Sequence, residues 1–251
     1  MIALIFFVGA CIGSVLTCII DRLATEEETW LRGRSRCPKC RTALSARSLV
    51  PIFSWVLQRG KCRTCQEKIS WTYPLIEVAT GALFVLAFLE RGTGNGALLL
   101  RDWYLIAILV IIFVFDLLYG LIVDSVTLPA IGILAITSLY FGMPWQTLAL
   151  GVCIGAGFFA FQYAVSRGRW IGGGDIRLGA LMGAALGWQR LLIALFLAYV
   201  VGAVVATVLL ASRRKQWSES VPFGTFLSIG TIIALYWGDA IMHWYVASLF
   251  R

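Results

Sequence analysis

Long apolar segments follow one another along most of this chain of 251 residues. Hydrophobic residues make up 60% of the sequence and charged residues only 14%, which is more apolar than a soluble core of this size would be. We therefore predict an all-α polytopic membrane protein with about eight transmembrane helices. Merging 175–188 with 190–211 would give seven. The candidate spans are 2–20, 74–90, 103–118, 121–142, 145–165, 175–188, 190–211 and 222–249.

Two Cys-x-x-Cys pairs lie in the basic loop after the first span. They are Cys37-Pro-Lys-Cys40 and Cys62-Arg-Thr-Cys65, with 21 residues between the inner cysteines. Four thiolates at this spacing can close a tetrahedral Zn²⁺ site, because each pair forms a tight knuckle. The spacing predicts a small zinc-ribbon-like insertion with a structural Zn²⁺, and two disulfides or unrelated thiols are the alternative. Thiols available for metal indicate a reducing compartment, so we expect the loop to be cytoplasmic.

The distribution of basic residues predicts the same orientation. Segments 21–73, 166–177 and 212–221 hold seventeen of the 21 Lys and Arg residues, and positively charged loops stay in the cytoplasm. The net charge of +8 is then explained by membrane orientation and by attraction to anionic lipid. Nucleic-acid binding is the weaker interpretation, because the basic residues flank spans and cysteines without forming a recognised binding module. We expect membrane lipid and no nucleic acid among the partners.

Carboxylates are the groups left to carry acid–base chemistry at membrane depth. The only histidine, His243, lies near the outer end of the last span, whereas Asp116, Asp124 and Asp175 fall at predicted inner ends. A carboxylate near hydrocarbon is costly, so it is usually retained for pairing, ion passage or chemistry. Two adjacent aspartates share a proton, so the pair can activate a water and protonate a leaving amine. Such a pair can hydrolyse a peptide bond without a metal or a covalent nucleophile.

Glycines surround the last of these aspartates. The run 172–174 directly precedes Asp175, and we expect it to adopt positive φ and to allow close approach of a substrate or another helix. Gly179, Gly183 and Gly187 follow at four-residue spacing, a pattern suited to close helix packing. Such a stripe usually indicates packing alone. Here it would hold Asp175 against a neighbouring helix.

With these motifs in place, the chain resembles the bacterial type IV prepilin peptidases, the leader peptidases and N-methyltransferases of type IV pilus and type II secretion systems. The resemblance covers nearly the whole chain, and its most specific parts are the cysteine knuckles and the Gly-x-Gly-Asp segment ending at Asp175. Other matching pieces are Gly13-Ser14-Val15-Leu16, Arg22-Leu23, Leu49 to Trp55, Arg59-Gly60-Lys61-Cys62, Tyr73 to Glu77 and Pro222-Phe223-Gly224.

The resemblance implies roles for individual residues. Asp116 and Asp175 match the family's catalytic aspartates, and Asp124 matches a further aspartate with a structural or supporting role. Gly172 and Gly174 would support Asp175. The implied organisation is a first transmembrane helix at 1–20, a cytoplasmic zinc-binding loop at 21–73 and a transmembrane aspartyl protease core at 74–251.

The resemblance also implies substrates and a second activity. The expected substrates are prepilins or pseudopilins, cleaved at the cytoplasmic face of the bacterial inner membrane, where the zinc loop and the aspartates would lie. Methylation of the new N-terminus from S-adenosylmethionine enters only through the resemblance, since the chain has no Rossmann-type glycine signature. The candidates for the methyl-donor site are Gly13, Ser14, Gly60 and Glu77.

Two other classes of function remain open from the residues alone. In a transporter or channel, Asp116, Asp124 and Asp175 would line a cation path and the glycines would break a helix, although the sequence shows no obvious internal repeat. In a non-enzymatic membrane scaffold, the zinc ribbon would dock a cytoplasmic partner. The sequence predicts no oligomeric state.

Overall fold

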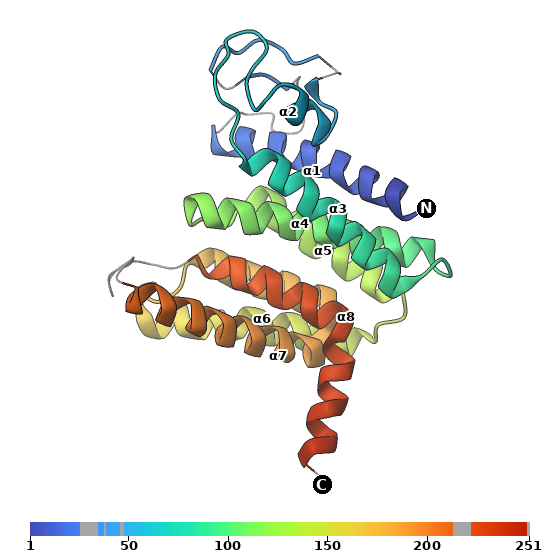
Figure 1. The fold of residues 1–251 in the computed structure, drawn as a ribbon. Coiled ribbons are helices and arrows are strands. Elements are labelled where there is room, and N and C mark those ends of the chain that lie inside the picture. The colour runs from blue at the N-terminus through green and yellow to red at the C-terminus, as the bar shows by residue number, and fades with distance from the viewer. Residues whose placement is uncertain (26–34, 38, 46–47, 213–221, 250–251) are drawn as a thin grey trace. The chain divides into compact units, whose positions relative to one another are not determined.

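The computed structural model describes residues 1–25, 35–37, 39–45, 48–212 and 222–249. In these residues the regular structure is helical, which confirms the predicted all-α class (Figure 1). Among the described residues, six helices are long and apolar enough to cross a membrane, and α5 is a shorter apolar helix. The part of the chain that the structure describes contains eight helices: α1 (Ile2–Ala24), α2 (Phe53–Leu57), α3 (Thr72–Arg91), α4 (Gly96–Tyr119), α5 (Asp124–Tyr140), α6 (Trp145–Ser166), α7 (Gly173–Ala211) and α8 (Phe223–Leu249).

The chain divides into two compact units, Met1–Ile111 and Ile112–Arg251. In the first unit, α1 and α3 pack side by side in antiparallel orientation (Figure 1). A Cβ atom on Gly9 would lie 2.8 Å from Gly81 Cα, and one on Gly13 would lie 2.8 Å from Glu77 Cα. The two backbones therefore touch at glycine, as in other close helix pairs of membrane proteins.

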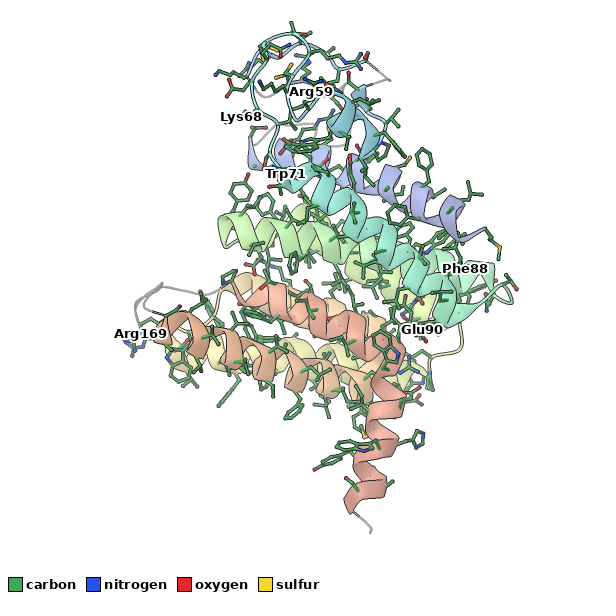
Figure 2. The ribbon with its side chains drawn as sticks, in the orientation of Figure 1. Arg59, Lys68, Trp71, Phe88, Glu90 and Arg169 are labelled. Carbon is green, nitrogen blue, oxygen red and sulfur yellow. The ribbon has the colours of Figure 1, made fainter. Side chains whose placement is uncertain are left out.

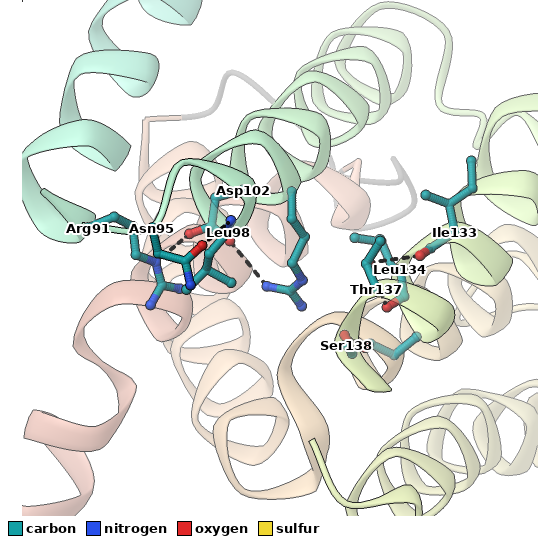
Figure 3. A network of polar contacts seen from close by, with 10 residues as sticks. Arg91, Asn95, Leu98, Asp102, Ile133, Leu134, Thr137 and Ser138 are labelled. Carbon is teal, nitrogen blue, oxygen red and sulfur yellow. Dashed lines mark hydrogen bonds and ion pairs between the residues drawn. The ribbon is translucent and has the colours of Figure 1, made fainter. Parts of the chain in front are cut away.

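A buried ion pair joins the end of α3 to the start of α4 (Figure 3). The Arg91 Nε donates to Asp102 Oδ2 at 2.6 Å, and Arg101 donates to the other carboxylate oxygen at 3.1 Å. Asp102 is 0% exposed. Asn95 caps α4 by accepting the Leu98 N–H at 3.0 Å. Because loss of one partner would leave a buried charge, the pair fixes how the two helices meet.

In the second unit, α7 is a hairpin rather than one straight rod. Gly187 interrupts it with φ 72° and ψ 173°, a conformation that glycine adopts without a steric cost. A Cβ atom on Gly155 of α6 would meet both the Gly179 oxygen, at 2.1 Å, and Leu191 Cδ2, at 3.3 Å. Positions on both sides of Gly187 therefore lie beside the same point of α6. The predicted segments 175–188 and 190–211 correspond to the two arms, 173–186 and 188–211.

The glycine stripe packs the first arm against α6, as the spacing predicted. Gly179 faces Gly155, and Gly183 faces Gly151, where an added Cβ would lie 2.2 Å from the Gly151 oxygen. The second arm runs antiparallel to α8, since Gly230 contacts Ala194 whereas Gly202 contacts Phe226. Figure 1 shows α6, α7 and α8 packed together in this unit.

This packing predicts a matched pair of stability effects. Gly179→Ala should lower the stability of the detergent-solubilised protein by about 1–3 kcal/mol, because its Cβ would lie 2.4 Å from the Gly155 oxygen and the helices would have to separate. Gly157→Ala on α6 is the control, since nothing lies within 4 Å of its Cβ. Thermal unfolding in detergent measures both variants. Equal midpoints for the two would contradict the close contact.

Candidate active site and cysteine cluster

The four cysteines of the two pairs form one cluster. Their sulfur atoms all lie within 4.8 Å of one another, and Cys37 Sγ is 3.8 Å from Cys65 Sγ. Four sulfurs held about 2.3 Å from a central Zn²⁺ in a tetrahedron are about 3.8 Å apart, whereas a disulfide requires about 2.05 Å. The cysteines are free thiols. The arrangement thus fits a tetrahedral metal and excludes the disulfide alternative in this structure.

The two knuckles share one backbone pattern. The Cys37 N–H donates to the Thr42 oxygen at 3.0 Å, and the Arg41 N–H donates back to the Cys37 oxygen at 2.8 Å. Cys62 makes the equivalent bonds at 2.8 and 3.0 Å. Arg41 and Gln66 both have positive φ, 54° and 58°, at the same place in each knuckle. This repeat points each pair of sulfurs toward one centre.

Hydrogen-bond donors favour the thiolate form that binds metal. The hydroxyl and the N–H of Thr42 bond to the Cys40 sulfur and lower its pKa to about 6. The N–H groups of Cys65 and Thr64 lower the pKa of Cys62 in the same way. The Glu67 N–H bonds to the Cys65 sulfur, but desolvation and the sulfurs of the other cysteines outweigh this bond and raise the pKa of Cys65 to about 11. A bound metal would hold this thiol deprotonated as well. By their position, Cys37, Cys40, Cys62 and Cys65 could hold a metal such as Zn²⁺, which would supply the cross-link that a small loop lacks.

A tight turn connects the cysteine loop to the α1–α3 pair. The Phe53 N–H donates to the Pro51 oxygen at 2.6 Å around Ile52, whose φ of 64° and ψ of −56° form a γ-turn that is strained for a β-branched residue. The Ile52 N–H donates to the buried Glu77 Oε2 at 2.7 Å. Ser14 also bonds to Glu77. Three of the four methyl-donor candidates, Gly13, Ser14 and Glu77, thus lie together.

The fourth methyl-donor candidate, Gly60, lies against the Trp55 side chain in the cysteine loop. It has φ 65°, and a Cβ atom there would lie 2.8 Å from the Trp55 ring. Trp55 in turn donates to the Ile69 oxygen at 3.2 Å and contacts the Trp71 ring at 3.9 Å between centroids. Figure 2 shows Arg59 and Lys68 on the loop, and Trp71 where the loop joins α3. Gly60 therefore allows the loop to close over Trp55.

Asp116 lies in the last turn of α4 and reaches the start of α8. Its Oδ2 atom accepts the Thr225 N–H at 3.0 Å, and the side chain is only 5% exposed. A Cβ atom on Gly224 would lie 2.9 Å from the same oxygen, so glycine is what admits the carboxylate. The exposed N–H groups of a helix N-terminus attract negative charge. Asp116 is held by the N-terminus of a helix distant in sequence.

Asp175 lies in the first turn of α7. Its Oδ2 atom accepts the Gly172 N–H at 3.0 Å, and the side chain is 7% exposed. The carboxyls of Asp116 and Asp175 are close enough to interact electrostatically. The structure therefore brings these two aspartates together at helix N-termini, without a cationic side chain between them in the described contacts.

The glycines before Asp175 do not have the positive φ that the sequence predicted. None of 172–174 has positive φ, and Gly172 is extended, with φ −80° and ψ 157°. Close approach is the reason that remains, because a Cβ atom on Gly174 would lie 2.7 Å from Ile122 Cβ. Ile122 belongs to the α4–α5 connection and also contacts Gly224. The expectation of close approach is thus met by a neighbouring segment of the chain itself.

The third aspartate has a different environment. Asp124 begins α5, is about half exposed, and forms an ion pair with Arg177 in the first turn of α7. The pair ties the start of α5 to the helix that carries Asp175. Asp124 is therefore neutralised by an arginine, whereas the Asp116 and Asp175 carboxylates accept backbone N–H groups of Thr225 and Gly172.

Sequence reasoning missed Thr225 and Ile122. Thr225 contributes a backbone N–H, which every residue type except proline carries, so its identity gave no signal. The Pro222-Phe223-Gly224 run directly before an apolar segment was the one available sign of a helix start at that place. Ile122 contributes only its bulk between Gly174 and Gly224.

Together these features define a class: a multi-pass helical membrane protein with a four-cysteine loop and two neighbouring buried aspartates. Residues 7–91 match the bacterial peptidase A24 N-terminal domain, and residues 103–207 match the type IV leader peptidase family. The chain belongs to this type IV leader peptidase family, the A24 aspartic peptidases of bacteria.

Two of three similar proteins match this chain over almost its full length. A prepilin leader peptidase/N-methyltransferase of Aeromonas salmonicida (strain A449) is 34% identical over 279 residues, covering 98% of this chain and 94% of the relative. The protein of the same name in Bacillus subtilis (strain 168) is 31% identical over 247 residues, covering 98% of both chains. A third, from Burkholderia pseudomallei (strain 1026b), is 36% identical over 215 residues, covering 82% of this chain and 67% of the relative. No solved structure matches the chain significantly.

Proposed function

We propose that this enzyme cleaves the leader peptide of type IV prepilins or type II secretion pseudopilins with Asp116 and Asp175 as the catalytic pair, and then N-methylates the new N-terminus. The observation that carries the proposal is the placement of two buried carboxyls around Ile122, which touches Gly224 beside Asp116 and Gly174 beside Asp175. Membership of the leader peptidase family supports the peptidase over a transporter or a non-enzymatic scaffold. The names of the relatives supply the prepilin substrates and the second activity.

The proposed chemistry divides acid and base work between the two side chains. One carboxylate takes a proton from a water molecule, whose oxygen attacks the carbonyl carbon of the scissile peptide. The other, protonated carboxyl gives its proton to the departing amine nitrogen as the C–N bond breaks. The Thr225 and Gly172 N–H groups each bond to an Oδ2 atom, which fixes both carboxyl planes for these transfers.

Supporting roles follow from the contacts around the pair. We assign Asp124 to positioning, because its ion pair with Arg177 holds the start of α5 beside the first turn of α7. Gly172 supplies an N–H to Asp175, and Gly174 admits Ile122. In this proposal, residues 74–251 form the protease core and 21–73 the zinc-binding loop.

The expected orientation suits a basic leader. If the basic loops face the cytoplasm, a positively charged leader is attracted to the same anionic leaflet, at about 1 kcal/mol per basic residue. The leader junction is then delivered to the membrane face where the proposal puts Asp116 and Asp175. This location is the cytoplasmic side of the bacterial inner membrane.

For methylation we propose the region of Gly13, Ser14 and Glu77, together with Gly60 of the loop. S-adenosylmethionine would supply the methyl group when bound. The support is the buried Glu77, which joins α1, α3 and the strained Ile52 turn at one place. Glu77 thereby fixes the loop entry against the two helices, so a donor site built by the loop would keep its shape.

The test uses solubilised wild-type protein and one prepilin. Incubation should produce a mobility shift of leader size, and mass spectrometry with S-adenosylmethionine present should find a single added methyl group on the new N-terminus. A pre-cleaved pilin segment separates the two activities, since it needs methylation alone. If no mobility shift appears at every enzyme concentration tested, the peptidase assignment for these substrates is rejected.

The glycines next to Asp175 provide a matched prediction. Gly174→Ala should lower cleavage about 10- to 100-fold, because its Cβ would displace Ile122 and the start of α7, and displacements of about 1 Å cost this much. Gly172→Ala should change cleavage little, since its φ suits alanine and the nearest atom to its Cβ is 3.7 Å away. Initial rates on the same prepilin measure both. A larger loss for Gly172→Ala would contradict this account.

A further inference from the structure

The short helix α2 turns apolar side chains outward. Phe53, Val56 and Leu57 follow the i, i+3, i+4 spacing that places side chains on one face of a helix, and they are 62%, 59% and 76% exposed. Trp55 instead packs within the loop, against Gly60. We call Phe53, Val56 and Leu57 the apolar face of α2. A helix that directs its large apolar residues away from the protein has its partner outside the chain.

Two hydrogen bonds place the start of α2 beside the spanning helices. The Ile52 N–H donates to Glu77 Oε2 at 2.7 Å, and Ser14 bonds to the same carboxylate. Glu77 is five residues after Thr72, the first residue of α3, or about 8 Å along the helix axis. Ser14 is ten residues before Ala24, the last residue of α1, or about 15 Å along its axis. Because α1 and α3 are long and apolar enough to cross a membrane, α2 begins at a depth inside the bilayer boundary (Figure 1).

The apolar face of α2 is continuous with an exposed stripe of α3. Trp55 contacts the Trp71 ring at 3.9 Å between centroids, and Trp71 directly precedes α3. Trp71, Leu75 and Val78 are spaced four and three residues apart, so they lie on one face, and all three are exposed. On a spanning helix such a face contacts lipid, and tryptophan is enriched where lipid meets water. The surroundings of α2 are therefore those of the outer side of α3.

The backbone at the start of α2 is suited to a site without water. The N–H groups of Phe53, Ser54 and Val56 donate to backbone oxygens of the preceding turn. The Ile52 N–H is taken by the Glu77 carboxylate. Backbone groups that enter lipid must be paired inside the protein, because hydrocarbon offers no hydrogen bonds. The strained turn at Ile52 meets this requirement while it starts the helix beside α1 and α3.

Basic side chains lie next to the apolar face. Arg59, Lys61 and Lys68 are exposed, and Lys61 pairs with Lys68 in an isolated antiparallel bridge (Figure 2). The Ile69 oxygen accepts the Trp55 indole N–H at 3.2 Å, which holds this bridge beside α2. Among the described residues, none of the three basic side chains forms an ion pair. Cations beside an apolar helix face are typical of segments that lie in an anionic lipid surface.

We infer that α2 is an interfacial helix, whose apolar face lies among the acyl chains of the leaflet on the side of the cysteine loop and whose neighbouring basic residues meet the anionic headgroups. The continuity with the outer side of α3 favours lipid over a protein partner. The cysteine loop is thereby held at the membrane surface by its own helix as well as by α1 and α3. The inference uses the membrane position of these helices and is independent of the proposed peptidase function.

The test introduces the photoreactive residue p-benzoylphenylalanine in place of Leu57, Arg63 or Leu75 in the full chain. Each variant is reconstituted in vesicles of phosphatidylethanolamine and phosphatidylglycerol and irradiated, and intact-mass spectrometry measures the fraction of chains that carry a lipid adduct. Position 57 should give about 10-fold more adduct than position 63, because Arg63 is a charged, exposed residue of the same loop that stays in water. Position 75, on the exposed stripe of α3, should give about the same yield as position 57.

Position 63 is the matched control, because both loop variants carry the same apolar probe and its own affinity for lipid cancels in the comparison. Thermal midpoints should equal that of wild type, since all three replaced side chains are exposed. Equal adduct yields at 57 and 63 would overturn the inference, as would an adduct at 57 with a second copy of the chain in place of lipid. Prepilin added in excess should leave the lipid adduct at 57 unchanged. A prepilin adduct that replaces the lipid adduct would assign the face to substrate and would also overturn the inference.

Discussion

Asp116→Asn and Asp175→Asn are each expected to abolish prepilin cleavage, with a loss of about 10²- to 10⁴-fold, the usual contribution of a positioned acid or base. Asparagine keeps the size of the side chain but cannot exchange a proton. It still accepts the hydrogen bond from Thr225 or Gly172, so the helix starts should hold their positions. The measurement is the initial rate of leader release by solubilised protein.

Asp124→Asn is the matched control for this pair. It removes a charge that Arg177 neutralises, and both side chains are about half exposed. Exposed ion pairs of this kind contribute roughly 0–1 kcal/mol, so cleavage should fall much less. Expression and metal content should equal those of wild type in all three variants. Complete loss of cleavage in all three variants would reopen the assignment of Asp116 and Asp175 as the catalytic pair. Substantial cleavage by Asp116→Asn or Asp175→Asn would contradict it.

The spans could be predicted from sequence because the cost of burying polar groups in lipid acts on each segment by itself. The connections between them could not be predicted as well. The region 175–211 allowed one helix or two, and the structure has one hairpin that reverses at Gly187. The reversal depends on contacts with α6 and α8, which composition does not encode. Asp124 was predicted at a span end, but its partner Arg177 comes from tertiary packing.

The aspartates were predictable for a similar reason. A carboxylate at membrane depth stands out in a sequence that is only 14% charged, and three of them fell at span ends. Their different environments were not predictable from charge alone. Asp116 depends on a backbone N–H more than a hundred positions away, at Thr225.

A glycine can be required either because the backbone has positive φ or because there is no room for a side chain. The run 172–174 predicted positive φ, yet positive φ occurs at Gly187 and Gly60 and not in the run. Glycine is needed at Gly174 because Ile122 occupies the place of a side chain. A sequence shows that a residue is small, but only the neighbours show which property of glycine is used.

Replacing Cys37 and Cys40 together by serine is expected to remove zinc from the protein. Serine hydroxyls do not provide the thiolates that a four-cysteine site needs, and two remaining sulfurs cannot close a tetrahedron. Structural zinc contributes about 10–16 kcal/mol in small zinc domains, so the loop should lose its fold and become sensitive to protease. Elemental analysis should fall from one zinc per chain to near zero. Limited proteolysis should then give new cuts within 39–71.

Cys153→Ser is the control, because Cys153 is an exposed thiol of α6 outside the cluster and should leave zinc content unchanged. Cleavage by the Cys37/Cys40 variant should fall less than in the aspartate variants, since the proposed proton transfers use carboxyls alone. Methylation of a pre-cleaved segment should fall more, because the loop connects through Ile52 to Glu77. Wild-type protein purified without chelator and found free of zinc would refute the metal assignment, since the knuckles would then keep their fold without it.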